Sequence, residues 1–86
     1  MTKESRVVYL EHGNVDAKSF KSLTVTIDKL DKSKGLHVTP IGQIPYGIFF
    51  YASYTANPDE IRIDAFNLGT AQTYVASHGF LIESTK

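Results

Sequence analysis

The sequence predicts an α+β fold: a mainly antiparallel sheet of about five strands with one or two helices packed on one face. Short runs of β-branched and aromatic residues are bounded by glycine, proline and asparagine, which is the pattern of strands that end in turns. Two other segments space apolar residues as on one side of a helix. The 86 residues, 42% hydrophobic and 21% charged, are enough for one small domain with one core, spanning 1–86.

Residues 6–12 are predicted to form the first strand. β-branched and aromatic residues dominate this run, and it ends in a Gly-Asn turn signal. Because side chains alternate along a strand, Val7 and Tyr9 would share one face and Val8 and Leu10 the other.

The segment 14–35 fits either a helix or a strand. As a helix it would align four large apolar residues on one stripe, namely Phe20, Leu23, Ile27 and Leu30. It would also have a candidate N-cap at Asp16 and a left-handed stop at Gly35. As a strand, the run 23–27 would alternate apolar residues with threonine, and Phe20 and Leu30 would fall on the polar face. The helix is preferred because it accounts for all four large apolar residues and for both ends.

Three strands are predicted in the middle of the chain. Residues 36–41 form one, and Pro40 indicates that its end lies at an edge of the sheet or at a bend, because proline cannot donate a ladder hydrogen bond. The run 46–54 holds five of the ten aromatic residues, and 60–66 alternates apolar and polar side chains. The short Asn-Pro-Asp connection between these two runs predicts a tight turn and therefore an antiparallel hairpin.

The segment 68–78 is predicted to be the second helix. Its apolar side would consist of Leu68, Ala71, Val75 and His78. Asn67 is suited to the N-cap and Gly79 to the C-terminal stop. Residues 80–83 would then form a short final strand.

Pairing 47–55 with 60–66 across the turn gives the hairpin two unequal faces. Tyr54 would lie opposite Ile61, and Phe49 opposite Phe66. One face is apolar and suited to a cover of helices. The other carries the candidate partner-binding residues, which are Phe49, Tyr51, Ser53, Arg62, Asp64 and Phe66. Aromatic residues beside an arginine are typical of the centre of a protein interface. The alternative is that the first strand or the terminal segments cover this face and make it core.

No catalytic constellation, metal site or cofactor site is predicted. The three histidines lie at the ends of different elements without metal-ligand spacing, and the chain has no cysteine. No nucleophile elbow and no phosphate-binding glycine loop is present. The sequence therefore predicts a protein that is not an enzyme.

The function predicted from the sequence is a small non-enzymatic protein-binding or regulatory module, inhibitor-like or adaptor-like. Its partner would be another protein or a second copy of the chain, forming a homodimer. The alternative, single-stranded nucleic-acid binding on the same aromatic strand, is disfavoured by a formal net charge of zero. The unbroken apolar run 48–52 is far shorter than the roughly 20 residues of a membrane span. No secretory signal is recognised, so a cytoplasmic location without membrane contact is expected.

Overall fold

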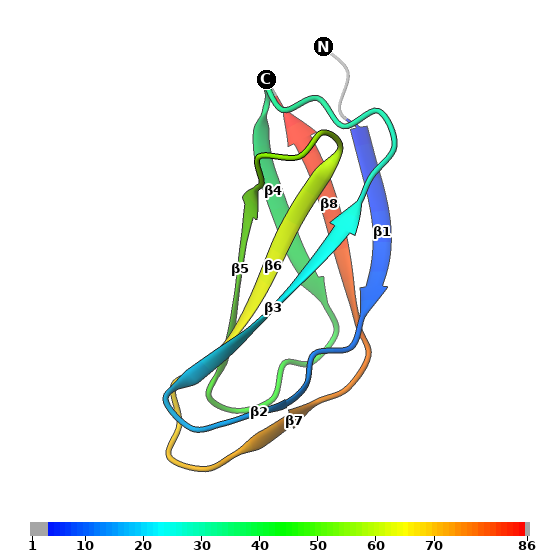
Figure 1. The fold of residues 1–86 in the computed structure, drawn as a ribbon. Helices are drawn as coiled ribbons and strands as arrows, with labels where there is room; N and C mark the ends of the chain where they lie inside the picture. Colours follow the sequence, from blue (N-terminus) through cyan, green and yellow to red (C-terminus); the bar gives the residue numbers. More distant parts are fainter. Residues whose placement is uncertain (1–3, 86) are drawn as a thin grey trace.

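The computed structural model describes residues 4–85, which form eight strands in three antiparallel sheets (Figure 1). The strands are β1 (Glu4–Leu10), β2 (Gly13–Val15), β3 (Ser19–Thr26), β4 (Gly35–Ile41), β5 (Ile48–Tyr54), β6 (Glu60–Asn67), β7 (Thr73–Val75) and β8 (His78–Thr85). No helix occurs in this range, so the predicted α+β fold is wrong and the observed fold is all-β. Residues 4–85 consequently offer no helix that could cross a membrane.

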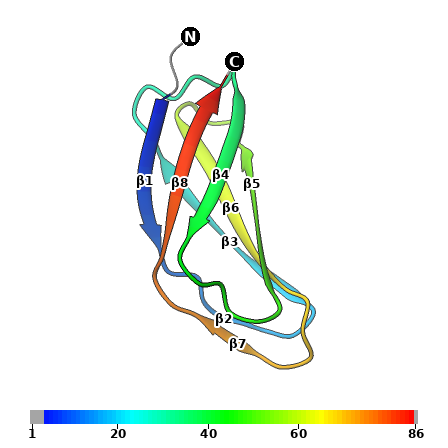
Figure 2. The same cartoon turned by 180° about the vertical axis from the view of Figure 1, so that it is seen from behind.

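Two three-stranded sheets pack face to face and form a sandwich. The sheet β3–β6–β5 lies in front in Figure 1, and the sheet β1–β8–β4 lies behind it and faces the viewer in Figure 2. The pair β2–β7 closes the lower end. The shortest dimension of the molecule is 17 Å, which suits two sheets packed about 10 Å apart.

The pairs β1–β8 and β2–β7 are two parts of one bent antiparallel ladder. Leu10 pairs with His78, and Gly13 pairs with Val75. Two residues separate these pairs on each side of the ladder, so β2–β7 continues the register of β1–β8. Gly13 has a φ of 78°, a conformation that glycine adopts without strain. The bend therefore directs the chain from the rear sheet to the lower end of the sandwich.

The first predicted helix is instead β3, which pairs with β6 from Ser19–Asn67 to Thr26–Glu60. The strand alternative for 23–27 is correct in its alternation: Leu23 and Val25 are more buried than Thr24 and Thr26. Leu-Thr-Val-Thr-Ile is rich in β-branched residues, which lose side-chain freedom in a helix and pack well on a sheet. The helical spacing of the large apolar residues was coincidental.

The second predicted helix, 68–78, is a loop followed by β7 and the start of β8. Asn67 is not an N-cap, because its buried side chain holds this loop together. Its Nδ2 donates hydrogen bonds to the carbonyl oxygens of Val15 and Ala71, both at 2.9 Å. Its Oδ1 accepts a hydrogen bond from the backbone nitrogen of Gly69, also at 2.9 Å. With these three hydrogen bonds, buried Asn67 stabilises the loop in place of the predicted helix.

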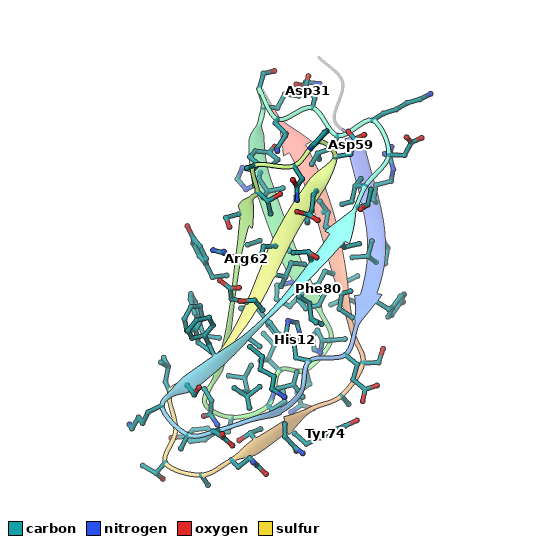
Figure 3. The ribbon with its side chains drawn as sticks, in the orientation of Figure 1. His12, Asp31, Asp59, Arg62, Tyr74 and Phe80 are labelled. Atoms are coloured by element: carbon teal, nitrogen blue, oxygen red, sulfur yellow. The ribbon has the colours of Figure 1, made fainter. Side chains whose placement is uncertain are left out.

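The core lies between the two sheets, where Figure 3 places Phe80. One cluster of buried residues comprises Ile27, Ile61, Ile63, Phe80 and Ile82. A second, smaller cluster comprises Val15, Ile48, Ala65 and Val75. Phe50 packs against both clusters. The apolar face of the predicted hairpin is thus buried, but the second sheet covers it in place of the predicted helices.

Several strand predictions are confirmed. The hairpin of β5 and β6 has the predicted register, with Tyr54 opposite Ile61 and Phe49 opposite Phe66. Strand β4 lies at the edge of its sheet, which is one of the two arrangements that Pro40 predicted. In β1, Val7 and Tyr9 are exposed, whereas Val8 packs against the core.

Candidate functional site

The outward side of β3–β6–β5, here called the aromatic face, contains all six predicted partner-binding residues. The register arranges its side chains in rows across the three strands. The lower three rows are Phe20–Phe66–Phe49, Ser22–Asp64–Tyr51 and Thr24–Arg62–Ser53. Neither β1 nor any other part of 4–85 forms a second layer over these rows, since Phe49 and Tyr51 are 55% and 53% exposed. The alternative in which this face becomes core is therefore wrong.

Three phenylalanine rings form a continuous row across the aromatic face. The ring centre of Phe66 lies 5.1 Å from that of Phe20 and 6.4 Å from that of Phe49. Such distances are typical of aromatic pairs in contact. Phe20 is 54% exposed and was not among the predicted site residues, because the helix interpretation placed it in the core. The strand alternative for the same segment places Phe20 on the polar face of its strand, but it does not place that strand beside β6.

An ion pair with one buried partner lies beside the phenylalanine row. Arg62 Nε is 3.3 Å from Asp64 Oδ1, and the two side chains are 48% and 5% exposed, respectively. Oδ1 is buried and accepts no hydrogen bond from any residue in 4–85, so its contact with Arg62 is an ion pair without hydrogen-bond geometry. A buried carboxylate on the outward side of a sheet is unusual enough to mark a candidate site.

The turn at the upper end of the aromatic face holds a carboxylate in a fixed position. Thr55 Oγ1 and Asn57 Nδ2 donate hydrogen bonds to Glu60 Oε1 at 2.7 and 2.9 Å. The bond from Thr55, followed by that from Asn57 and the charge of Lys32, holds the pKa of Glu60 below its ordinary value. Lys32 also donates to the carbonyl oxygen of Asn57 at 2.6 Å. Glu60 is thus engaged within the turn.

The lower end of the aromatic face carries an exposed leucine. Leu68 is exposed, although the predicted helix would have turned it inward. Its backbone nitrogen donates to the carbonyl oxygen of Gly47 at 2.8 Å. Its own carbonyl oxygen accepts a hydrogen bond from Lys18 Nζ at 3.2 Å. Lys21 is exposed as well, but it lies opposite Ala65 in an inward row and is not part of the aromatic face.

The outward side of β1–β8–β4, here called the opposite face, is organised differently. Its rows across β1, β8 and β4 are Val7–Leu81–Thr39 and Tyr9–Gly79–Ile41. Gly79 lies within β8 and is not the predicted helix stop. A Cβ atom at Gly79 would lie 2.9 Å from Cε2 of Tyr9, so the tyrosine ring occupies the space above this glycine.

Two of the three histidines lie together in the core. His12 and His78 are buried, and their rings pack against Phe50 with centroid distances of 5.7 and 5.3 Å. Figure 3 shows His12 between the sheets. His12 Nε2 is 2.9 Å from the carbonyl oxygen of Ile63, which can only accept, so this nitrogen carries the proton. No group of three potential metal ligands exists within residues 4–85.

The fold and the site place the chain in a structural class only: a small two-sheet β-sandwich with one exposed aromatic face. Comparison with protein-family models, with curated proteins and with solved structures gives no match in any of the three cases. Inference about function therefore depends on the surfaces themselves.

Proposed function

We propose that this protein is a non-enzymatic protein-binding module that acts through the aromatic face. The observation that carries the proposal is the contiguity of three phenylalanine rings, an exposed tyrosine and a half-exposed arginine on one side of one sheet. Interface centres are enriched in aromatic residues and arginine, and the energetically dominant residues are often of these types. A role as an inhibitor or adaptor in the cytoplasm is part of the proposal.

The test is capture of partners from the native host by three forms of the tagged chain. These are the wild type, the variant Tyr51→Ala/Arg62→Ala, and the control Val7→Thr/Ile41→Thr on the opposite face. We expect a partner retained by the wild type and the control but lost by the aromatic-face variant, whose thermal melt should remain close to that of the wild type. Equal retention by all three forms would place the binding surface elsewhere. A large loss of melting temperature in Tyr51→Ala/Arg62→Ala would assign these side chains a structural role.

The partner in this proposal is another protein or a second copy of the chain. Size exclusion with light scattering separates the two cases. A homodimer formed by the aromatic face should become monomeric in Tyr51→Ala/Arg62→Ala and remain dimeric in Val7→Thr/Ile41→Thr. A wild type that is monomeric at high protein concentration would remove self-association from the proposal.

A second candidate function, single-stranded nucleic-acid binding, is favoured by the phenylalanine row alone. Exposed aromatic rings are platforms on which bases stack. The balanced charge of the chain disfavours it, because phosphate binding normally requires a basic excess. Oligonucleotide binding that weakens with salt and is lost in Phe49→Ala would support this candidate, and no binding at low salt would end it.

A further inference from the structure

We propose that a second copy of this chain pairs antiparallel with the open edge of β5, with the two-fold axis between the two Tyr51 residues. The two sheets β3–β6–β5 would then join into one continuous sheet. This inference goes beyond the proposed function, because it concerns the backbone edge of the sheet and not the outward side chains alone.

Strand β5 is the least protected edge of the two large sheets. The edge strands are β1 and β4 in one sheet and β3 and β5 in the other. Proteins commonly block such edges against further pairing with charged residues, proline or a bulge. The first three strands carry residues of these kinds, namely Arg6 in β1, Pro40 in β4 and Lys21 in β3. Strand β5 has no charged residue, no proline and an unbroken register with β6.

The hydrogen bonds of the hairpin show which backbone groups of β5 face away from β6. The backbone nitrogen of Thr55 donates to the carbonyl oxygen of Glu60 at 3.4 Å. At the other end of the hairpin, Leu68 donates in the same way to Gly47 at 2.8 Å. Both pairs continue the register of β5 and β6, in which hydrogen-bonded and non-hydrogen-bonded pairs alternate. The odd-numbered residues of β5 therefore bond to β6, and the even-numbered residues direct N–H and C=O to the edge.

The chain itself limits the open part of this edge to its centre. At the start of the strand, the backbone nitrogen of Ile48 donates to the carbonyl oxygen of Pro45 at 3.1 Å. Beyond its end, Lys32 Nζ donates to the carbonyl oxygen of Thr55. The stretch between these contacts is 49–53, so the open edge is centred on residue 51.

One register of two β5 strands satisfies the open groups. Within 49–53, the groups that face the edge belong to Phe50 and Ala52. Placing Tyr51 opposite its own copy sets each Phe50 opposite an Ala52, and each such pair exchanges two N–H···O=C hydrogen bonds. A shift of one residue would instead set these groups against groups that point back to β6. A shift of two residues would set one of them against the strand ends, where Ile48 already donates to Pro45.

The same register gives favourable neighbours on the aromatic face. The two Tyr51 residues would form a non-hydrogen-bonded pair, in which opposite side chains lie closest. Cross-strand aromatic pairs stabilise a sheet, and Tyr51 is more than half exposed in the single chain. Phe49 would lie opposite Ser53 of the second copy. No like charges would meet, because β5 carries none.

A second copy is the favoured occupant because the incoming strand must also have an open, uncharged edge. Among the strands of seven or more residues within 4–85, β5 alone lacks both charged residues and proline. Figures 1 and 2 both show the upper part of β5 at the margin of the sandwich, with β4 on its inner side. A two-fold axis perpendicular to the sheet would place both aromatic faces on the same side of the dimer.

The first experiment is amide hydrogen exchange of the nitrogen-15-labelled full chain, measured by nuclear magnetic resonance at low-micromolar and near-millimolar protein concentrations. We expect the amides of Phe50 and Ala52 to exchange about tenfold more slowly at the high concentration, since pairing protects them by mass action. The amides of Phe49, Tyr51 and Ser53 are internal controls, because they bond to β6 at every concentration.

The second experiment is size exclusion with light scattering on Tyr51→Lys, Tyr51→Glu and the control Ser22→Lys. The wild type should be a dimer that dissociates on dilution, because one strand pair forms a small interface. Each Tyr51 variant alone should be monomeric, since like charges would lie directly opposite, and an equal mixture of the two should restore a dimer. Ser22 lies in the same row on the far strand, β3, so Ser22→Lys should remain dimeric. Thermal melts establish that the variants are folded.

The outcomes separate this inference from the proposed function. A monomeric wild type at near-millimolar concentration would overturn the inference, and so would exchange at Phe50 and Ala52 that does not depend on concentration. A dimer that is lost in Ser22→Lys while this exchange stays constant would overturn edge pairing but support self-association through the aromatic face. Protection of the two amides only after a captured host protein is added would overturn the second copy as the occupant and leave protein binding supported.

Discussion

The aromatic face and the opposite face differ in how an outward position of the middle strand is occupied. On the opposite face one outward position, near the start of β8, is Gly79, and the ring of Tyr9 fills the space above it. On the aromatic face an outward position in the middle of β6 is Asp64, whose Oδ1 is buried and accepts no hydrogen bond from within 4–85. The opposite face thus has the gap above its glycine filled by the chain itself, whereas the aromatic face keeps a polar atom that costs stability.

Exposed apolar area alone does not identify a site on this molecule. Both faces expose large apolar side chains, and Tyr9, at 70%, is more exposed than Phe20, Phe49 or Tyr51. Scattered exposed apolar residues are normal on protein surfaces. The aromatic face is distinguished by rings that contact one another and by a charge held next to them.

The largest expected effect on stability is at the centre of the phenylalanine row. Phe66→Ala removes two ring contacts, each worth about 0.5–1.5 kcal/mol, so we expect a loss of about 1–3 kcal/mol in the free energy of unfolding. Leu81→Ala is the matched change on the opposite face, where the leucine has valine and threonine as cross-strand neighbours. Urea denaturation of both variants measures the difference. An equal or smaller loss in Phe66→Ala would mean that the row is not a packed unit.

Replacing the ion pair should increase stability. In Arg62→Thr/Asp64→Val, a buried carboxylate is removed and a β-branched residue takes its place, so we expect a gain of about 1 kcal/mol in the free energy of unfolding. Ser22→Val, in the same row, controls for the effect of adding valine to this face. A loss of stability in the double variant would instead show that the ion pair is there to stabilise the sheet.

The contact between Tyr9 and Gly79 should appear as a coupling energy. Tyr9→Ala is expected to cost up to about 1 kcal/mol in the wild type and close to nothing in a Gly79→Ala background, because a Cβ at Gly79 already displaces the ring. A double-mutant cycle by chemical denaturation gives the value. Additive effects of the two changes would contradict the view that Tyr9 completes the opposite face.

The smallest expected effect is a dependence on pH at the turn of the aromatic face. The pKa of Glu60 is lowered in the folded state, chiefly by the hydrogen bond from Thr55, so its contribution to stability is present above its unfolded pKa of about 4.3. That contribution is lost as the pH falls through the folded pKa. Glu60→Gln should therefore melt at a lower temperature than the wild type at pH 7, and the two should converge in acid. A difference that stays constant down to pH 2 would contradict this assignment.

The candidate site could be predicted largely from the sequence because it depends on one local hairpin. A short turn between 47–55 and 60–66 fixes the register, and strict alternation then assigns each side chain to a face. The six predicted residues follow from those two facts. Phe20 could not be assigned in the same way, since its place beside Phe66 depends on a strand pairing 46 residues away in the sequence.

The sequence by itself determined where the hairpin turns and which of its side chains share a face, because these depend on local backbone chemistry. Tertiary structure alone decided that 20–30 and 68–78 are not helices. Both segments have apolar residues at helical spacing. In 20–30 a helix is excluded by pairing with the distant strand β6. In 68–78 it is excluded by the buried hydrogen bonds of Asn67 and by pairing with distant strands. Only the packed sandwich shows that Asp64 is buried beneath Arg62, since burial depends on all three strands of the sheet at once.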